Sequence, residues 1–370
     1  MAGIYIHIPF CKSACNYCNF HFATSLNKKD QLMAAINQEL MIRFTEERMN
    51  LDTIYFGGGT PSILPVEDVA TVLNTIAKHY TINAGAEITL EANPDDINVE
   101  KLQQWKFIGV NRLSIGIQSF FEEDLKWMSR AHNSAQAQEA LQLALTYFDN
   151  ITIDLIYGTP GLSHFRWQQN VEKAISFKVP HLSCYALTVE PKTPLNKLIR
   201  MHQKSDVDPE IQSEQFLMLM QWAREAGYEH YEISNFALPG FRSRHNSSYW
   251  KGKSYIGIGP SAHSYDGQSR QWNIANNQHY IDAIQKGQLP CESETLTEVQ
   301  RLNESIMISL RTMEGIDLSQ FSKQKVQTVL NGAEKYINQQ KLLVSDGFLK
   351  LSDQGKLYAD GIAADLFFDE

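Results

Sequence analysis

The stretch Cys11-Lys-Ser-Ala-Cys15-Asn-Tyr-Cys18 places three cysteines within eight positions, directly after the apolar run 4–9. Sulfur atoms spaced by four and then three positions allow one loop to present three thiolates to a single metal centre. Thiolates are the ligands that iron–sulfur centres require. Three protein ligands on a four-iron cluster leave one iron open to a small molecule. The alternative is a zinc site, which needs a fourth ligand that His7 or His21 could supply.

Around this loop, short apolar runs alternate with stretches of helical periodicity. The pattern predicts six strands, at 4–9, 53–56, 87–91, 112–118, 151–157 and 181–187, and helices at 31–49, 66–79, 135–147 and 167–177. The strands begin 25 to 49 residues apart, which is typical of β-α units with a parallel sheet. Six units are too few for a complete eight-unit barrel. The sequence therefore predicts an α/β fold with a partial (β/α)6 TIM-like barrel.

The chain changes character after residue 238. From 239 to 268 it is rich in Ser, Gly, Arg and aromatic residues, which predicts a long irregular stretch. From 298 onward two helical stretches precede two apolar runs joined by Asp346-Gly347, a strong type I′ hairpin signal. This order predicts a small winged-helix-like α+β domain. The segment is not strongly basic, so we give a DNA-binding role little weight.

Composition narrows the function classes. The 370 residues carry 33 basic and 42 acidic side chains, a net charge of −9, which argues against a nucleic-acid-binding protein. No segment approaches the roughly 20 apolar residues of a transmembrane helix, and the start of the chain is too short and lacks the basic region of a secretory signal. We therefore expect a cytoplasmic protein with reduced thiols, in which Cys184 and Cys291 act as small apolar residues.

Four further motifs accompany the cysteines: Tyr5-Ile-His-Ile-Pro-Phe-Cys11, Phe56-Gly-Gly-Gly-Thr-Pro61, Leu113-Ser-Ile-Gly-Ile-Gln-Ser119 and Ile153-Asp-Leu-Ile-Tyr-Gly158. Together with the cysteine spacing, they make the chain resemble the radical S-adenosylmethionine (SAM) superfamily. Within it, the motifs resemble the branch of oxygen-independent coproporphyrinogen III dehydrogenases and HemW-type haem chaperones. The resemblance covers essentially the whole chain.

The resemblance implies a [4Fe-4S] cluster on Cys11, Cys15 and Cys18, with SAM chelating the fourth iron and an electron from the cluster cleaving its sulfonium bond. Matching positions imply that a further group of residues surrounds SAM: Tyr5, Tyr17, Gly58, Gly59, Thr60, Glu91, Gln118, Arg130 and Asp154. Arginine suits the methionyl carboxylate, and glycine lets the backbone approach a ligand closely. Singly, each residue could equally be a cap, a tight turn or a surface ion pair.

Two features separate the members of this branch. The resemblance implies that the dehydrogenases carry a further cysteine two positions after the third cluster cysteine, where this chain has Phe20. It also implies that they carry an extension before the cysteine motif, whereas only ten residues precede Cys11 here. The stretch His245-Asn-Ser-Ser-Tyr-Trp250 matches the HNxxYW motif of the haem chaperones, which implies haem binding by His245. A lone histidine would otherwise be weak support. Nearby Arg and Lys residues (Arg242, Arg244, Lys251 and Lys253) suit the haem propionates.

We therefore predict a haem chaperone that delivers haem to acceptor haem proteins such as respiratory enzymes. The alternative is an oxygen-independent coproporphyrinogen III dehydrogenase. The predicted organisation is a radical SAM core at 1–238, an irregular connecting region with the HNxxYW motif at 239–297, and a HemW-like C-terminal domain at 298–370. Whether the chain is an enzyme, and whether it forms a homodimer, stays open.

Overall fold

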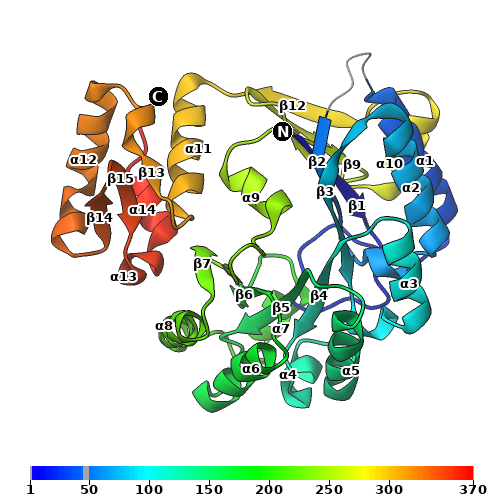
Figure 1. Cartoon of the computed structure of the whole chain (residues 1–370), viewed down its shortest axis with the longest axis horizontal. Helices are drawn as coiled ribbons and strands as arrows, with labels where there is room; N and C mark the ends of the chain where they lie inside the picture. The colour runs from blue at the N-terminus through cyan, green and yellow to red at the C-terminus, as the bar shows by residue number, and fades with distance from the viewer. Residues whose placement is uncertain (1, 45–49, 370) are drawn as a thin grey trace.

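The computed structural model describes residues 2–44 and 50–369. At its centre lie six parallel strands in chain order, each paired with the next (Figure 1). They are β1 (Ala2–Ile8), β2 (Asn50–Gly58), β3 (Thr81–Ala92), β4 (Arg112–Gln118), β5 (Ile151–Tyr157) and β6 (His181–Ala186). The prediction of a partial six-unit barrel is confirmed.

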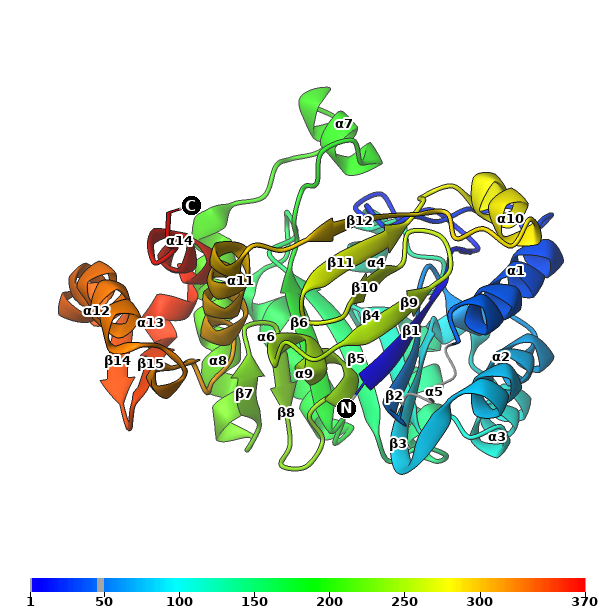
Figure 2. The same ribbon diagram turned by 90° about the horizontal axis from the view of Figure 1, so that it is seen from above.

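Helices cover the convex side of this curved sheet (Figure 1). They are α1 (Lys29–Ile42), α2 (Val66–His79), α3 (Val99–Phe107), α4 (Glu122–Trp127), α5 (Ser134–Leu145), α6 (His164–Ser176) and α8 (Pro209–Glu225). The short helix α7 (Pro194–Arg200) projects away from the barrel, as Figure 2 shows. In α2 the buried residues Val69, Val72 and Ile76 recur at helical spacing and face the sheet. The predicted helix 31–49 begins and ends early, at Lys29 and Ile42, and its part at 45–49 lies outside the described residues.

Each barrel strand has one apolar and one polar face. On β4, for example, Leu113, Ile115 and Ile117 belong to the main hydrophobic core, while Arg112 and Ser114 point to the other side. The apolar face packs against the helices. The polar face lines the inside of the barrel and supplies the functional side chains described below.

The expectation of an irregular stretch after residue 238 is wrong. Strand β9 (Tyr255–Ile258) pairs in parallel with β1, and the sheet continues through β10 (His263–Tyr265), β11 (Ser269–Asn273) and β12 (Cys291–Thr295), as Figure 2 shows. Helix α9 (Arg244–Trp250) precedes β9, and α10 (Asn277–Gln285) lies between β11 and β12. On the opposite edge, β8 (Asn235–Ala237) and β7 (Glu229–Glu232) extend the sheet beyond β6. These strands have only three to five residues, too few to show a clear hydrophobic period.

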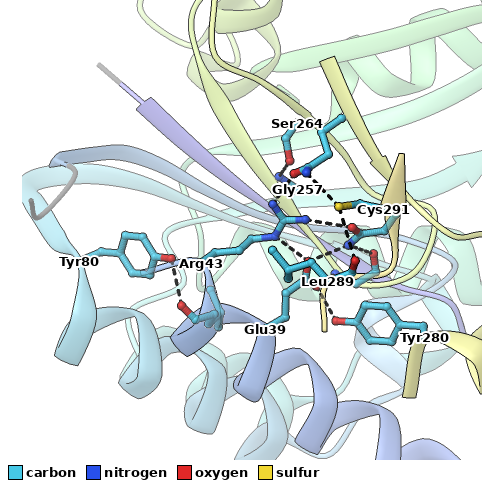
Figure 3. A network of polar contacts seen from close by, with 12 residues as sticks. Glu39, Arg43, Tyr80, Gly257, Ser264, Tyr280, Leu289 and Cys291 are labelled. Atoms are coloured by element: carbon cyan, nitrogen blue, oxygen red, sulfur yellow. Dashed lines mark hydrogen bonds and ion pairs between the residues drawn. The ribbon is translucent and has the colours of Figure 1, made fainter. Parts of the chain in front are cut away.

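A buried polar network fastens this extension to α1 (Figure 3). The Glu39 carboxylate, fully buried, accepts hydrogen bonds from Gly259 N (2.8 Å), the Tyr280 hydroxyl (2.5 Å) and Arg43 Nε (2.7 Å). Asn273 donates a further bond to it (2.7 Å). Because a buried carboxylate needs such partners, this glutamate ties α1 to three segments distant in sequence.

The C-terminal residues form a small α+β module with its own hydrophobic core. It contains α11 (Glu298–Leu310), β13 (Ile316–Asp317), α12 (Lys323–Asn338), β14 (Leu342–Ser345), β15 (Phe348–Leu351), α13 (Asp353–Lys356) and α14 (Ala359–Asp365). The predicted hairpin turn is confirmed, with positive φ at Asp346 (53°) and Gly347 (82°) as a type I′ turn requires. Among the helices of the described ranges, none combines the length and apolar character that a bilayer crossing requires.

Candidate cluster and cofactor site

The carboxyl ends of the barrel strands surround a cavity of about 540 Å³, here named the cluster cavity. Eleven of the thirteen residues predicted to bind a ligand line it: Cys11, Cys15, Cys18, Tyr17, Gly58, Gly59, Thr60, Glu91, Gln118, Arg130 and Asp154. Tyr5 and His245 do not. Side chains far apart in sequence meet here because parallel strands end at the same edge of the sheet.

The three cysteines lie on the loop after β1, are half-buried and form no disulfide. The loop is fixed by backbone hydrogen bonds between Cys11 and Ala23 (3.1 Å) and between Ala23 and Pro9 (2.8 Å). Two donors face the sulfur atoms: Thr60 Oγ1 lies 3.5 Å from Cys11 Sγ, and Arg130 Nη1 lies 3.4 Å from Cys15 Sγ. Burial raises the pKa of Cys11 to about 11. Hydrogen-bond donors aimed at sulfur fit a thiolate-bound iron–sulfur cluster.

The alternative zinc ligands are engaged elsewhere. His7 Nε2 lies 2.9 Å from the carbonyl oxygen of His21, and His21 Nε2 lies 2.7 Å from Asn277 Oδ1. Within residues 2–44 and 50–369, no three His, Cys, Asp or Glu side chains gather closely enough to hold one metal ion.

The glycines after β2 serve the fold as well as the cavity. Gly58 has φ = 110°, and a Cβ there would lie 2.6 Å from the His7 ring. A Cβ on Gly59 would lie 2.6 Å from the carbonyl oxygen of Phe10. The absence of side chains therefore lets this turn pack against the cysteine loop, which brings its backbone to the cavity wall.

Two carboxyl groups face the cavity from adjoining parts of the barrel. Glu91 accepts hydrogen bonds from the Tyr55 hydroxyl (2.7 Å) and from Gly58 N (3.2 Å). Burial raises the pKa of Glu91 to about 7. Burial, with the charge of Glu91, also raises the pKa of Asp154 to about 7. Such acids can hold a proton or accept hydrogen bonds from ligand hydroxyl or ammonium groups.

Arg130 connects the cysteine loop to the strand ends. Its Nη2 donates to Asn93 Oδ1 (2.6 Å) and to the Gly116 carbonyl (2.8 Å), while Nη1 faces Cys15. Its Nε is buried with no partner among the described residues. Beside it, Gln118 adopts φ = 65° at the end of β4, a strained conformation that aims its amide at the cavity.

Tyr5 lies behind the cavity rather than on its wall. Its ring stacks on Tyr55 with 6.0 Å between centroids, and its hydroxyl lies 3.3 Å from His7 Nδ1. It therefore supports the wall through Tyr55.

His245 is 1% exposed and lies at the opposite, amino-terminal end of the barrel strands. Its Nδ1 lies 2.8 Å from Thr53 Oγ1, its Nε2 lies 2.7 Å from the Tyr249 hydroxyl, and its ring stacks on Tyr55 (4.9 Å). Burial lowers the pKa of His245 to about 3, so the ring is neutral. The buried Glu87 carboxylate accepts the backbone N–H of His245 (2.9 Å) and fixes the start of α9. Both ring nitrogens are thus occupied.

Several residues that line the cluster cavity were not predicted from the sequence, among them Tyr55, Ser114, Ser183 and Asn246. A signal was present: polar residues recur at every second strand position, as in Glu87, Thr89 and Glu91, and these residues face the inside of the barrel. Register then places Ser114 opposite Glu91 and Ser183 opposite Asp154. Asn246 had no comparable signal, because α9 reaches the cavity only through the long-range fold.

Comparisons with known proteins agree with this architecture. The Radical SAM superfamily model matches residues 5–174, and that of the HemN C-terminal domain matches 296–358. The heme chaperone HemW of Bacillus subtilis is 33% identical over 87% of this chain and 86% of its own length. That of Mycobacterium tuberculosis is 31% identical over 98% and 94%, and that of Lactococcus lactis 34% identical over 86% and 83%.

One solved structure covers almost the whole fold. Coproporphyrinogen III oxidase (HemN) from Escherichia coli superimposes with a TM-score of 0.85 over 99% of this chain and 90% of its own, at 21% identity. At that identity the likeness describes the fold alone.

Proposed function

The chain belongs to the HemW family of the radical SAM superfamily, and from this premise we propose that it is a haem chaperone that binds haem and passes it to acceptor haem proteins. The observation that carries the proposal is the alignment with proteins named heme chaperone HemW across both the barrel and the C-terminal module. The acceptors we propose are respiratory haem enzymes, and the location we propose is the cytoplasm.

We propose that Cys11, Cys15 and Cys18 hold a [4Fe-4S] cluster in the cluster cavity and that SAM binds beside it. When bound, this pair supplies one-electron chemistry. The chain's own residues orient the ligands: Arg130 offers guanidinium donors, and Glu91 and Asp154 offer buried oxygens. Gly58, Gly59, Thr60, Gln118 and Tyr17 complete the proposed wall, and Tyr5 supports it from behind.

We propose a matching division of the chain. Residues 1–238 hold the cluster and SAM, 239–297 carry the HNxxYW motif, and 298–370 form the C-terminal domain. The Arg311 side chain supports this arrangement, because it pairs with the buried Glu232 of β7 (2.9 Å) and lies over the Trp250 ring (5.2 Å). The C-terminal module and the motif are thereby held together.

The alternative, coproporphyrinogen III dehydrogenation, draws on the likeness to HemN in fold. Against it stands Phe20, which lines the cluster cavity at the position where the resemblance places a further cysteine in the dehydrogenases. We therefore keep it as the second candidate.

One experiment separates the two candidates. The purified protein, loaded anaerobically with haem, is mixed with the haem-free form of a respiratory haem enzyme, and acceptor activity is followed. We expect activity to appear with the loaded protein faster than with free haem. In parallel, coproporphyrinogen III is incubated with the protein, SAM and a reductant. Decarboxylated product, with no haem transfer, would refute the chaperone proposal.

A further inference from the structure

A second cavity, of about 440 Å³, lies on the other side of α9 and is here named the α9–α11 cavity. Its volume falls within the range of roughly 300–1,000 Å³ usual for ligand pockets. It is formed by the end of α9 and the following turn, by β9 to β11, and by α11. Its lining residues are Tyr249, Trp250, Lys251, Gly252, Lys253, Tyr255, Tyr265, Arg270, Arg301, Glu304, Ser305, Ile308 and Ser309.

Aromatic rings dominate the inner wall. The Tyr249 and Tyr255 rings meet edge to face with 4.6 Å between their centroids. The centroids of the Tyr255 and Tyr265 rings lie 6.4 Å apart. Trp250 adds an indole whose Nε1 is buried with no hydrogen-bond partner in the described part of the chain. Rigid aromatic faces of this kind suit a flat, largely apolar ligand.

The rim is positively charged, although the whole chain has a net charge of −9. Four cationic side chains face one carboxylate, Glu304, and Arg270 is paired with that carboxylate. Lys251 and Lys253 are exposed and form no ion pair within residues 2–44 and 50–369. A flat apolar ligand with anionic groups on its edge, as in an iron porphyrin with two propionates, matches both surfaces.

The cavity also contains a side chain that can bind a metal, whereas His245 is not available for that role. Both ring nitrogens of His245 are occupied, and its side chain is buried. Tyr249 is engaged by His245, and Tyr265 donates to the Gly267 carbonyl (3.2 Å). The Tyr255 hydroxyl makes no hydrogen bond in the described residues and is free to reach a ligand; burial raises its pKa, and the charge of Arg270 opposes that rise. Tyrosine is an established axial ligand of haem iron.

We propose that the α9–α11 cavity is the haem seat of this protein, with Lys251 and Lys253 at the propionates and Tyr255 on the iron. His245 is a positioning residue: it connects Thr53 of the barrel to Tyr249 and so fixes α9 between the two cavities. This inference rests on the proposed haem-carrying function, and it differs from the sequence-based prediction that His245 itself binds the iron.

The test is a titration of the full-length protein with haem and, separately, with metal-free protoporphyrin IX. The Lys251→Glu/Lys253→Glu variant should bind both about tenfold more weakly, since both ligands carry propionates. The matched control, Lys78→Glu/Lys286→Glu, makes the same charge change at exposed lysines outside the cavity and should bind as the wild type does. Equal affinity of the two variants would overturn the assignment.

Tyr255→Phe identifies the iron ligand. It should weaken haem binding about tenfold, leave metal-free porphyrin binding within about twofold, and remove the phenolate bands from the resonance Raman spectrum of the ferric complex. His245→Gln should keep those bands while lowering affinity, as expected of a positioning residue. A wild-type spectrum of histidine ligation that disappears in His245→Gln would overturn the proposal. Failure of the wild type to bind haem at all would instead refute the proposed function.

Discussion

The two cavities on either side of α9 are built in different ways. The cluster cavity is formed mostly by barrel strands and the turns directly after them, and its chemistry comes from thiols and buried carboxyl groups. The α9–α11 cavity is formed by aromatic and cationic side chains from short strands and two helices. Asn246 lines the first, and Tyr249 and Trp250, on the same helix, line the second. One motif thus contacts two sites with unlike chemistry, which suggests that their ligands can be separated by mutation.

The largest expected effect is the complete loss of the iron–sulfur cluster from the cluster cavity. In a Cys11→Ala/Cys15→Ala/Cys18→Ala variant, anaerobic reconstitution with iron and sulfide should leave no cluster, because no thiolate remains in the cluster cavity. Iron and sulfide analysis and electron paramagnetic resonance after reduction measure this.

The control is Cys291→Ala, which removes a half-buried cysteine outside the cavity and should retain the cluster. Full iron and sulfide content in the triple variant would show that the three cysteines do not hold the metal.

The second prediction concerns the support of the α9–α11 cavity. Arg311 donates through Nε (3.1 Å) and Nη2 (2.9 Å) to the buried Glu232 carboxylate and lies over the Trp250 ring. Arg311→Met leaves that carboxylate without its cation, which should lower the free energy of unfolding by about 3 kcal/mol and weaken haem binding. Denaturant unfolding and haem titration measure the two effects.

The matched control removes the other partner of the same arginine. Asp360 is highly exposed, so Asp360→Asn should change stability by no more than about 0.5 kcal/mol. Cluster content should be unchanged in both variants. Equal stability of Arg311→Met and Asp360→Asn would show that the buried pair does not support this wall.

The third prediction concerns the cluster cavity alone, where the effect is spread over a range of pH. Because burial raises the pKa of Glu91 from 4.5 to about 7, the ligand-free fold is favoured while this carboxyl is protonated. Stability should therefore fall as the pH rises from about 4.5 to about 7. Glu91→Gln should reduce that fall by at most about 3.5 kcal/mol, since the pKa rises by about 2.5 units and each unit corresponds to about 1.4 kcal/mol. Thermal unfolding across this pH range measures it.

Glu139→Gln, at an exposed position of α5, serves as the control and should keep the wild-type pH dependence. If Glu91→Gln showed the same slope as Glu139→Gln, Glu91 would not be the buried acid that this cavity implies.

The two cavities also differ in how much of each could be predicted from the sequence. The barrel strands and the residues of the cluster cavity were predictable, because Cys11–Cys18, Gly58 and Glu91 lie in local motifs at strand ends. Their ligand roles stay predictions. The α9–α11 cavity was not predictable: Tyr255, Arg270 and Arg301 are dispersed, and only the pairing of β9 with β1 and the docking of α11 bring them together.

His245 illustrates the same limit. A histidine in a recognised motif suggests a ligand, but the sequence contains no sign that Thr53 and Tyr249 occupy its two ring nitrogens. The contact with Thr53 spans 192 residues of chain and depends on α9 entering the barrel, whereas Tyr249 lies only four residues after His245.

The most direct test of the central claim, two ligands in two separate cavities, is a count of iron after both have been offered to one sample. The wild-type protein is reconstituted anaerobically, loaded with haem, freed of excess and analysed for total iron, sulfide and haem. The account predicts four cluster irons and one haem per chain together, with unchanged haem affinity in the triple cysteine variant. Mutual exclusion of cluster and haem, or loss of haem binding with the cysteines, would contradict it.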